Sequence, residues 1–166
     1  MKSDSSNEDQ PNIVSLFKLT HKDLYYKGPT WNVKLRTVLT NMDCLTIANG
    51  TRLYPTIPNN IPPTEFPAEP LYPVAIPPDL VPIRADINLH ISEKKLWFDQ
   101  CKELKEDRRR WRLENNAGCK FILSNIDDIL QNRCIANASN LPLLYTQITE
   151  MSANPSIAEI QLIDDA

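Results

Sequence analysis

The residue types that most often carry chemistry are scarce in this chain of 166 residues. The two histidines, His21 and His90, belong to no recognisable catalytic motif. The four cysteines stand far apart, as Cys44, Cys101, Cys119 and Cys134. A zinc site needs clustered ligands, and the three glycines nearly exclude a glycine-rich phosphate loop. The sequence therefore predicts a protein that is not an enzyme and that has no metal or cofactor.

One local sequence, KELKEDRRRWR at residues 102–112, is typical of nucleic-acid binding, because arginines beside an aromatic residue hold phosphates and stack on bases. The RNA contacts would be Arg108, Arg109, Trp111 and Arg112. Acidic neighbours offset these charges, however, and residues 92–116 have a net charge of only +2. A solvated helix face with pairs such as Glu106–Arg110 is the simpler interpretation, and it leaves any RNA binding weak or indirect.

Composition indicates one ordinary domain, with 42% hydrophobic and 23% charged residues and a net charge of −3. No run approaches the roughly 18 apolar residues of a membrane-spanning helix, and the polar start lacks the apolar part of a secretory signal. We therefore expect a cytoplasmic protein without membrane association, in which the cysteines are small buried hydrophobic side chains.

The first half of the chain predicts an extended lead and two helices. Residues 1–12 are polar and are expected to be disordered, and the lead follows from residue 13. Apolar residues from Trp31 onward recur every three or four positions, which predicts a helix capped by Thr30. Asp43 is the expected cap of a second, short helix through Ala48, and Gly50 is its left-handed stop.

Residues 55–82, here called the proline-rich segment, contain ten of the fourteen prolines, so neither a helix nor a central strand can form there. We expect an extended loop over residues 55–91 that lies on the helices and buries its apolar side chains. The alternative is a polyproline ligand for a groove of the SH3 or WW kind. The apolar side chains concerned are Ile57, Ile61, Phe66, Leu71, Tyr72, Val74, Ile76, Leu80 and Val81.

From Ser92, a capping residue, a helical pattern continues for about forty residues, and Gly118 within it indicates a bend or the close approach of another element. A last helix is predicted between Asn140, as its cap, and Pro155, with Pro142 in its first turn. The expected fold is all-α: a small bundle of about four to five helices, in a single domain over residues 13–151. The tail, residues 152–166, either packs on this domain or binds a partner.

The segment LTHKDLYYKGPTWNVKLRTVLTNMDCLTIANG resembles the start of the Gag polyprotein of copia-type LTR retrotransposons, and the resemblance covers residues 18–151. In that family a lead and two helices are followed by a loop, a Trp-containing helix and a short last helix. Tyr145 stands where the family usually has tryptophan, and the proline-rich connection is unusually long. The matching positions are Trp31, Leu35, Leu39, Leu45, Gly50, Trp111, Ala117, Ile122, Ile126 and Tyr145.

This resemblance implies an amino-terminal capsid lobe, which associates with copies of itself and with full-length Gag in a virus-like particle. The chain would then be a fragment, a decayed element or a retained host copy. The self-association surface is expected on the outer face of the first helix, at Asn32, Lys34, Arg36 and Thr37. Two alternatives remain: an adaptor that docks through the proline-rich segment or the helix at residues 92–111, and a small RNA-binding protein.

Overall fold

The computed structural model describes residues 15–57, 65–78 and 80–153, and this part of the chain forms helices without a named β-strand. The predicted all-α class and small helical bundle are confirmed. The predicted disordered head and nearly all of the tail lie outside the described residues. The helices are α1 (Leu24–Asn41), α2 (Leu45–Ala48), α3 (Arg84–Ser124), α4 (Asp128–Arg133), the 3-10 helix η1 (Ile135–Asn137) and α5 (Leu141–Ala153).

The chain divides into two units where the sequence predicts a single domain. Unit 1 comprises Met1–Thr51 with Asn115–Ala166, and unit 2 comprises Arg52–Glu114. The long helix α3 contributes its first part to unit 2 and its last ten residues to unit 1.

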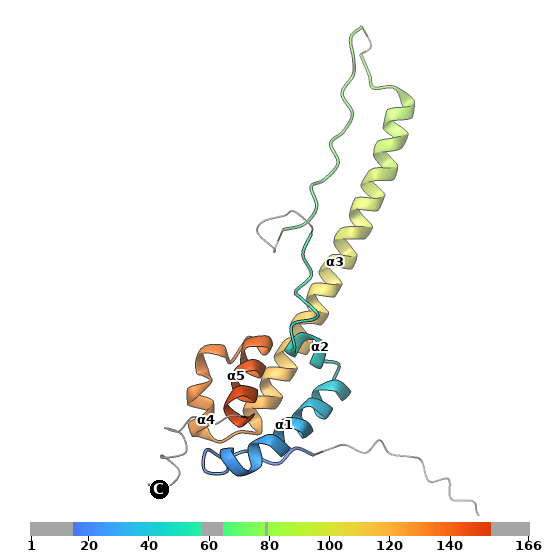
Figure 1. Ribbon diagram of the computed structural model, residues 1–166. Helices are drawn as coiled ribbons and strands as arrows, with labels where there is room; N and C mark the ends of the chain where they lie inside the picture. Colours follow the sequence, from blue (N-terminus) through green and yellow to red (C-terminus); the bar gives the residue numbers. More distant parts are fainter. Residues whose placement is uncertain (1–14, 58–64, 79, 154–166) are drawn as a thin grey trace, which may run out of the picture. The chain divides into compact units, whose positions relative to one another are not determined.

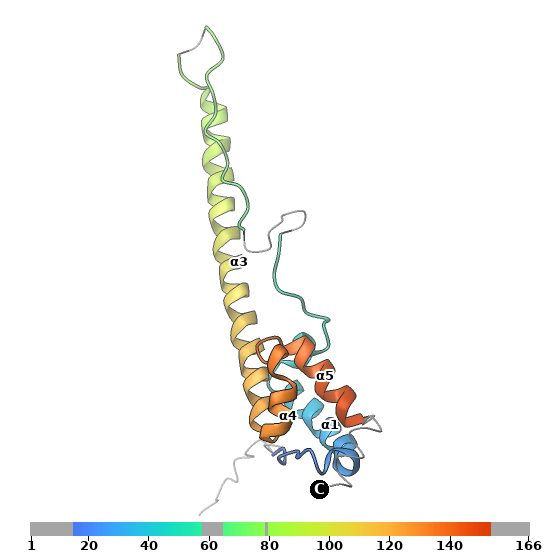
Figure 2. The ribbon, with the colours of Figure 1, turned by 90° about the vertical axis from the view of Figure 1, so that its left-hand side faces the viewer.

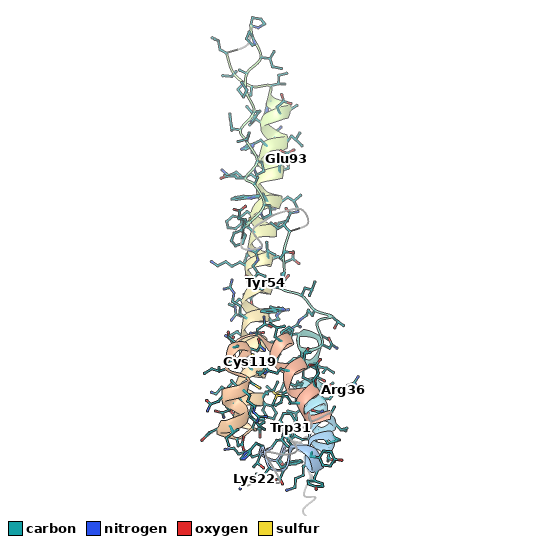
Figure 3. All side chains as sticks on the ribbon, turned by 60° about the vertical axis from the view of Figure 1, so that its left-hand side comes forward. Lys22, Trp31, Arg36, Tyr54, Glu93 and Cys119 are labelled. Carbon is teal, nitrogen blue, oxygen red and sulfur yellow. The ribbon has the colours of Figure 1, made fainter. Side chains whose placement is uncertain are left out.

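In unit 1, α1 and α2 pack against α5 (Figure 1). The predicted apolar face of α1 is buried. Trp31 is fully buried, and its indole Nε1–H donates to the carbonyl of Phe17 at 3.0 Å. Figure 3 shows Trp31 inside this group of side chains and Arg36 at its outer side. Burial of the tryptophan ring without loss of its hydrogen bond makes Trp31 a central core residue.

Helix α1 begins earlier than predicted, since Asp23, not Thr30, precedes it, and Pro29 lies inside it. The first turn is held by the Lys27 backbone N–H, which donates to the Asp23 carbonyl at 2.8 Å, and by burial of Leu24. These interactions offset the stability that is lost because Pro29 has no N–H to donate within the helix. Thr30 is an exposed residue within the helix.

Asp43 ends α1 instead of capping α2, which is preceded by Cys44. Its φ is 58°, and the Cys44 N–H donates to the Leu39 carbonyl at 2.9 Å, the pattern of a Schellman motif. An aspartate tolerates this left-handed conformation better than most residues. The predicted left-handed Gly50 is confirmed, with a φ of 76°.

Two glycines mark close approaches within unit 1. A Cβ on Gly28 of α1 would overlap the backbone of Ser152 in α5, with only 2.9 Å to its Cα. A Cβ on Gly118 of α3 would lie 2.5 Å from a methyl carbon of Leu141. The predicted close approach at Gly118 is therefore confirmed. Gly28 faces backbone and has no room for a side chain, whereas a Cβ at Gly118 would displace the Leu141 side chain.

The helix predicted to start at Ser92 starts at Arg84 and stops at Ser124. It stops because the carbonyl of Asn125 accepts from Leu19 at 2.8 Å, and the N–H of Asp127 donates back to the Leu19 carbonyl at 2.9 Å. This isolated parallel bridge holds the predicted extended lead in place. Asp127 then caps α4, since its Oδ1 accepts from the Leu130 N–H at 2.9 Å.

Helix α5 follows its predicted start. The Oδ1 of Asn140 accepts from the N–H of Leu143 at 3.2 Å, so Asn140 caps the helix as expected. Pro142 stands in the first turn, where its missing donor has no partner to lose. The buried side chains of Leu141, Leu144 and Ile148 form the inner face of the helix.

Five of the ten positions on which the sequence resemblance rests are buried in unit 1, as expected for a core. These five are fully buried: Trp31, Leu35, Leu39, Ile122 and Ile126. Leu45 and Tyr145 are half-buried. The prediction is wrong for Ala117, which α3 presents to solvent. Trp111 belongs to unit 2 and is half-buried there.

In unit 2 the described residues 65–78 run as an extended segment beside the first part of α3, in both views (Figures 1 and 2). The extended form agrees with the prediction, but the loop ends before Arg84, because residues 84–91 are helical. The predicted burial is wrong: Leu71 is 90% exposed and Leu80 is 96% exposed. A single helix offers one face to an extended segment, so side chains that point the other way stay in solvent. Ile61 lies outside the described residues.

Candidate functional site

The most elaborate group of polar contacts in unit 2 surrounds Arg108, on the second half of α3. Arg108 is only 3% exposed. Its Nε donates to the carbonyl of Pro55 at 2.9 Å, and its Nη2 donates to the carbonyl of Glu65 at 2.8 Å. The guanidinium also lies over the rings of Phe66, at 5.0 Å, and Tyr54, at 5.6 Å. One arginine thus binds the extended chain at two points ten residues apart, Pro55 and Glu65.

The two tryptophans of α3 bind carbonyls of the same extended chain. The indole Nε1–H of Trp97 donates to the Pro67 carbonyl at 2.8 Å, and that of Trp111 donates to the Arg52 carbonyl at 3.2 Å. Proline cannot donate to a strand ladder, so a proline-rich chain has carbonyls that need partners from elsewhere. Side chains of α3 supply these donors in place of a neighbouring strand.

The four residues predicted as RNA contacts all have partners within unit 2. Arg108 is buried, and the ring of Trp111 packs edge-on against Tyr54 with centroids 5.3 Å apart. Arg112 donates to the Tyr54 hydroxyl at 2.7 Å. Arg109 pairs with Glu106 at 2.7 Å, where the sequence suggested Arg110 as the partner of Glu106. Two of the four predicted residues, Arg108 and Trp111, therefore serve the packing of unit 2.

The ion pair on the surface of α3 perturbs the titration of both partners. The hydrogen bond from Arg109 holds the pKa of Glu106 below its ordinary value, and the same bond raises the pKa of Arg109. Both side chains are exposed, so the pair is a weak contributor to stability.

Beside these contacts lies a groove of about 420 Å³, here called the aromatic groove, which the sequence did not indicate. The side chains that line it are Phe66, Trp97, Phe98, Cys101, Lys102 and Lys105. A second groove of about 640 Å³ shares Phe66 and the two lysines. It is also lined by Glu106, Arg108, Arg109 and Arg112.

The spacing of the lining residues on α3 explains why the two grooves are basic. Phe98, Lys102, Lys105, Arg109 and Arg112 follow one another at steps of three and four residues, so they share one helix face. The acidic residues that balance the net charge of the helix, such as Glu103 and Asp107, fall on the opposite side. The net charge of the sequence does not reveal this basic face. The face becomes apparent when the residues are grouped by the helical repeat of 3.6 residues.

Unit 2 also exposes many large apolar side chains. On the segment they include Leu71, Val74, Ile76, Leu80 and Val81, and on α3 they include Leu89, Ile91, Leu96 and Phe98. Where such side chains gather into one contiguous patch, they mark a site of protein interaction. Leu96 and Phe98 lie in the helix predicted for docking at residues 92–111, and the apolar residues of the segment lie in the other predicted docking region.

On α1, the predicted self-association surface is exposed at Lys34, Arg36 and Thr37. Asn32, by contrast, is half-buried. Its Nδ2 donates to the carbonyl of Thr149 at 3.2 Å, and its Oδ1 accepts from the Ser152 hydroxyl at 2.5 Å, so Asn32 fixes α1 against α5.

The pair most similar to a catalytic arrangement joins His21 and Asp127, whose Nδ1 and Oδ2 atoms lie 2.6 Å apart. Burial would raise the pKa of Asp127, but hydrogen bonds from the His21 ring, the His21 N–H and the Leu130 N–H outweigh it and lower the pKa. The pair ties the lead to the start of α4, where Asp127 is the cap. These hydrogen bonds hold the lead against the start of α4, which is a structural role.

Three cysteines behave as the buried hydrophobic residues that the sequence predicts. Cys44, Cys119 and Cys134 are buried, whereas Cys101 is partly exposed in the aromatic groove. Burial raises the pKa of Cys119 to about 11, with a smaller contribution from Cys44. Within the described ranges, no cluster of three or more His, Cys, Asp or Glu residues could hold a metal ion.

Comparisons with known proteins returned no matching family model, no matching curated protein and no matching solved structure. Among the helices that the structure describes, none combines the length and apolar character needed to cross a bilayer.

Proposed function

We propose that this protein is a structural, self-associating helical protein of the kind found in the capsid lobe of copia-type Gag. It would contribute to the shell of a virus-like particle, either within an element or as a retained or truncated copy. The observation that carries the proposal is the set of apolar side chains that unit 2 exposes. Contact with further copies of the chain would remove this surface from water.

The amount of exposed apolar surface supports an association function. Leu71 and Leu80 have nearly their full surface in solvent, and Leu96 and Phe98 are more than half exposed. Burial of apolar surface stabilises association by about 25 cal/mol per Å², before the entropic cost of association is subtracted. A few such side chains in one contact therefore provide a substantial driving force.

Polar residues around this surface would supply specificity rather than most of the affinity. The basic face of α3 and the exposed Lys34 and Arg36 of α1 are suited to acidic surfaces on another copy. The buried Arg108 and the packed Trp111 weaken the case for a protein whose main task is RNA binding.

Sedimentation velocity of the purified, nuclease-treated chain tests the proposal. The test variant combines Leu71→Ser and Leu96→Gln, which remove exposed apolar groups without opening a cavity. The matched control combines Glu69→Gln and Ser92→Ala, exposed polar positions on the same segment and helix. We expect oligomers for the native chain and the control, and a lower sedimentation coefficient for the test variant, with equal helicity by circular dichroism.

A native chain that sediments as a monomer at every concentration would contradict self-association. If it then captured one unrelated protein through the same Leu71 and Leu96 side chains, the adaptor function would replace the proposal.

A further inference from the structure

The aromatic groove of unit 2 has a composition that a plain oligomer contact does not require. Its lining includes three aromatic side chains, Phe66, Trp97 and Phe98, together with Lys102 and Lys105. The adjoining groove adds Arg109 and Arg112 against a single carboxylate, Glu106. A ligand that fits both parts has aliphatic side chains followed by negative charge.

The chain itself contains such a segment outside the described residues. Residues 154–166 read NPSIAEIQLIDDA and contain no lysine or arginine. Its four large aliphatic residues stand beside three acidic ones, Glu159, Asp164 and Asp165. The polar head of the chain, residues 1–12, has acidic residues too but lacks a comparable aliphatic group.

We propose that the aromatic groove binds the tail, residues 156–165, of a second copy of this chain. Ile160 and Ile163 contact the aromatic side chains of the groove. Asp164 and Asp165 face Lys102, Lys105 and the arginines of the adjoining groove. Each copy has one groove and one tail, so two copies exchange tails reciprocally, as a two-fold pair requires. The inference rests on the proposed self-association and names the partner of one part of its surface.

The charged and the apolar residues of this contact affect binding of the tail in different ways. Opposite charges across an interface raise the association rate and select the partner, and apolar side chains on aromatic rings supply most of the affinity. The interaction should therefore weaken both with added salt and with the loss of either isoleucine.

Fluorescence anisotropy of a labelled peptide with the sequence of residues 154–166 measures the contact directly. The receptor is the full chain with Ile160→Ser and Ile163→Ser, whose own tail then no longer competes. We expect saturable binding that Lys105→Glu weakens at least about tenfold. Arg110→Glu, on the same helix but outside both grooves, is the matched control and should leave binding within about twofold.

Two further measurements separate a groove contact from general attraction. A peptide with Asp164→Lys and Asp165→Lys should bind the Lys102→Glu and Lys105→Glu double variant better than it binds the native groove. Bound native peptide should also slow alkylation of Cys101, the one cysteine that lines the groove.

The outcomes that overturn the inference are distinct. If the chain oligomerises but the peptide does not bind, tail exchange is wrong and self-association stands. If the peptide binds but the tail substitutions leave the molar mass of the chain unchanged, the second copy is the wrong source of the tail. If labelled oligouridylate binds the groove and Lys105→Glu abolishes this binding, while the peptide does not compete, the groove is a nucleic-acid site instead.

Discussion

Replacement of Arg108 is the most informative change to unit 2, because one buried guanidinium holds the extended chain at Pro55 and at Glu65. Arg108→Met keeps an unbranched side chain of similar length and removes both hydrogen bonds. Hydrogen bonds from a charged group contribute about 1.5 to 3 kcal/mol each. Loss of both should therefore favour local opening of the segment by about 3 kcal/mol or more, roughly a hundredfold in the opening equilibrium.

The bond after Glu65 reports this opening, since a glutamate-specific protease needs an extended, released backbone at that point. We expect the native chain to be cleaved slowly there and the Arg108→Met variant to be cleaved at least about tenfold faster, the rate following the population of the open form. Arg110→Met removes a neighbouring exposed arginine and serves as the control. Equal cleavage after Glu65 in the native chain and the Arg108→Met variant would refute the assigned role of Arg108.

Three further predictions concern unit 1 and the thiols. Gly28→Ala forces a Cβ into the backbone of α5 and should destabilise the protein by about 1 to 3 kcal/mol in urea denaturation, whereas Thr30→Ala on the exposed face should change stability by less than about 0.5 kcal/mol. Because the pKa of Asp127 is lowered in the folded state, its carboxylate stabilises the fold above the ordinary aspartate pKa of about 3.9, and this contribution is lost as the pH falls further. The difference in urea midpoint between the native chain and Asp127→Asn should therefore be largest above about pH 5 and shrink toward pH 2; a difference that grows with acidity would contradict the sign. With a pKa of about 11, Cys119 is about one part in a thousand thiolate at pH 8, so iodoacetamide should modify Cys101 well before it, as mass spectrometry of the native protein would show.

The core faces of the helices could be predicted from the sequence, because burial follows the helical repeat. The stripe that begins at Trp31 lies on the buried side of α1, and Gly118 meets another helix where its missing side chain suggested. Both features are local patterns that any packed helix must satisfy.

Helix ends were harder to predict, because distant residues determine them. Asp43 looks like a helix cap in the sequence, yet its left-handed backbone closes α1. The break after Ser124 depends on hydrogen bonds to Leu19, more than a hundred residues earlier in the chain. A continuous helical pattern in the sequence therefore does not predict a helix end that a distant residue causes.

The candidate site was only partly visible for a similar reason. The cluster around Trp111 is distinguished by its charge, but nothing in its local sequence separates the buried Arg108 from the exposed Arg109. The role of Arg108 depends on carbonyls of the proline-rich segment, which lies more than forty residues away. The shortage of backbone donors in that segment was the physical clue, since its carbonyls need donors from other side chains.

The molar mass of the native chain by light scattering on a size-exclusion column, over a hundredfold concentration range after nuclease treatment, tests self-association most directly. The proposed function predicts a mass that rises with concentration from 19.0 kDa to a closed oligomer in the absence of nucleic acid. A mass of 19.0 kDa at every concentration would contradict it.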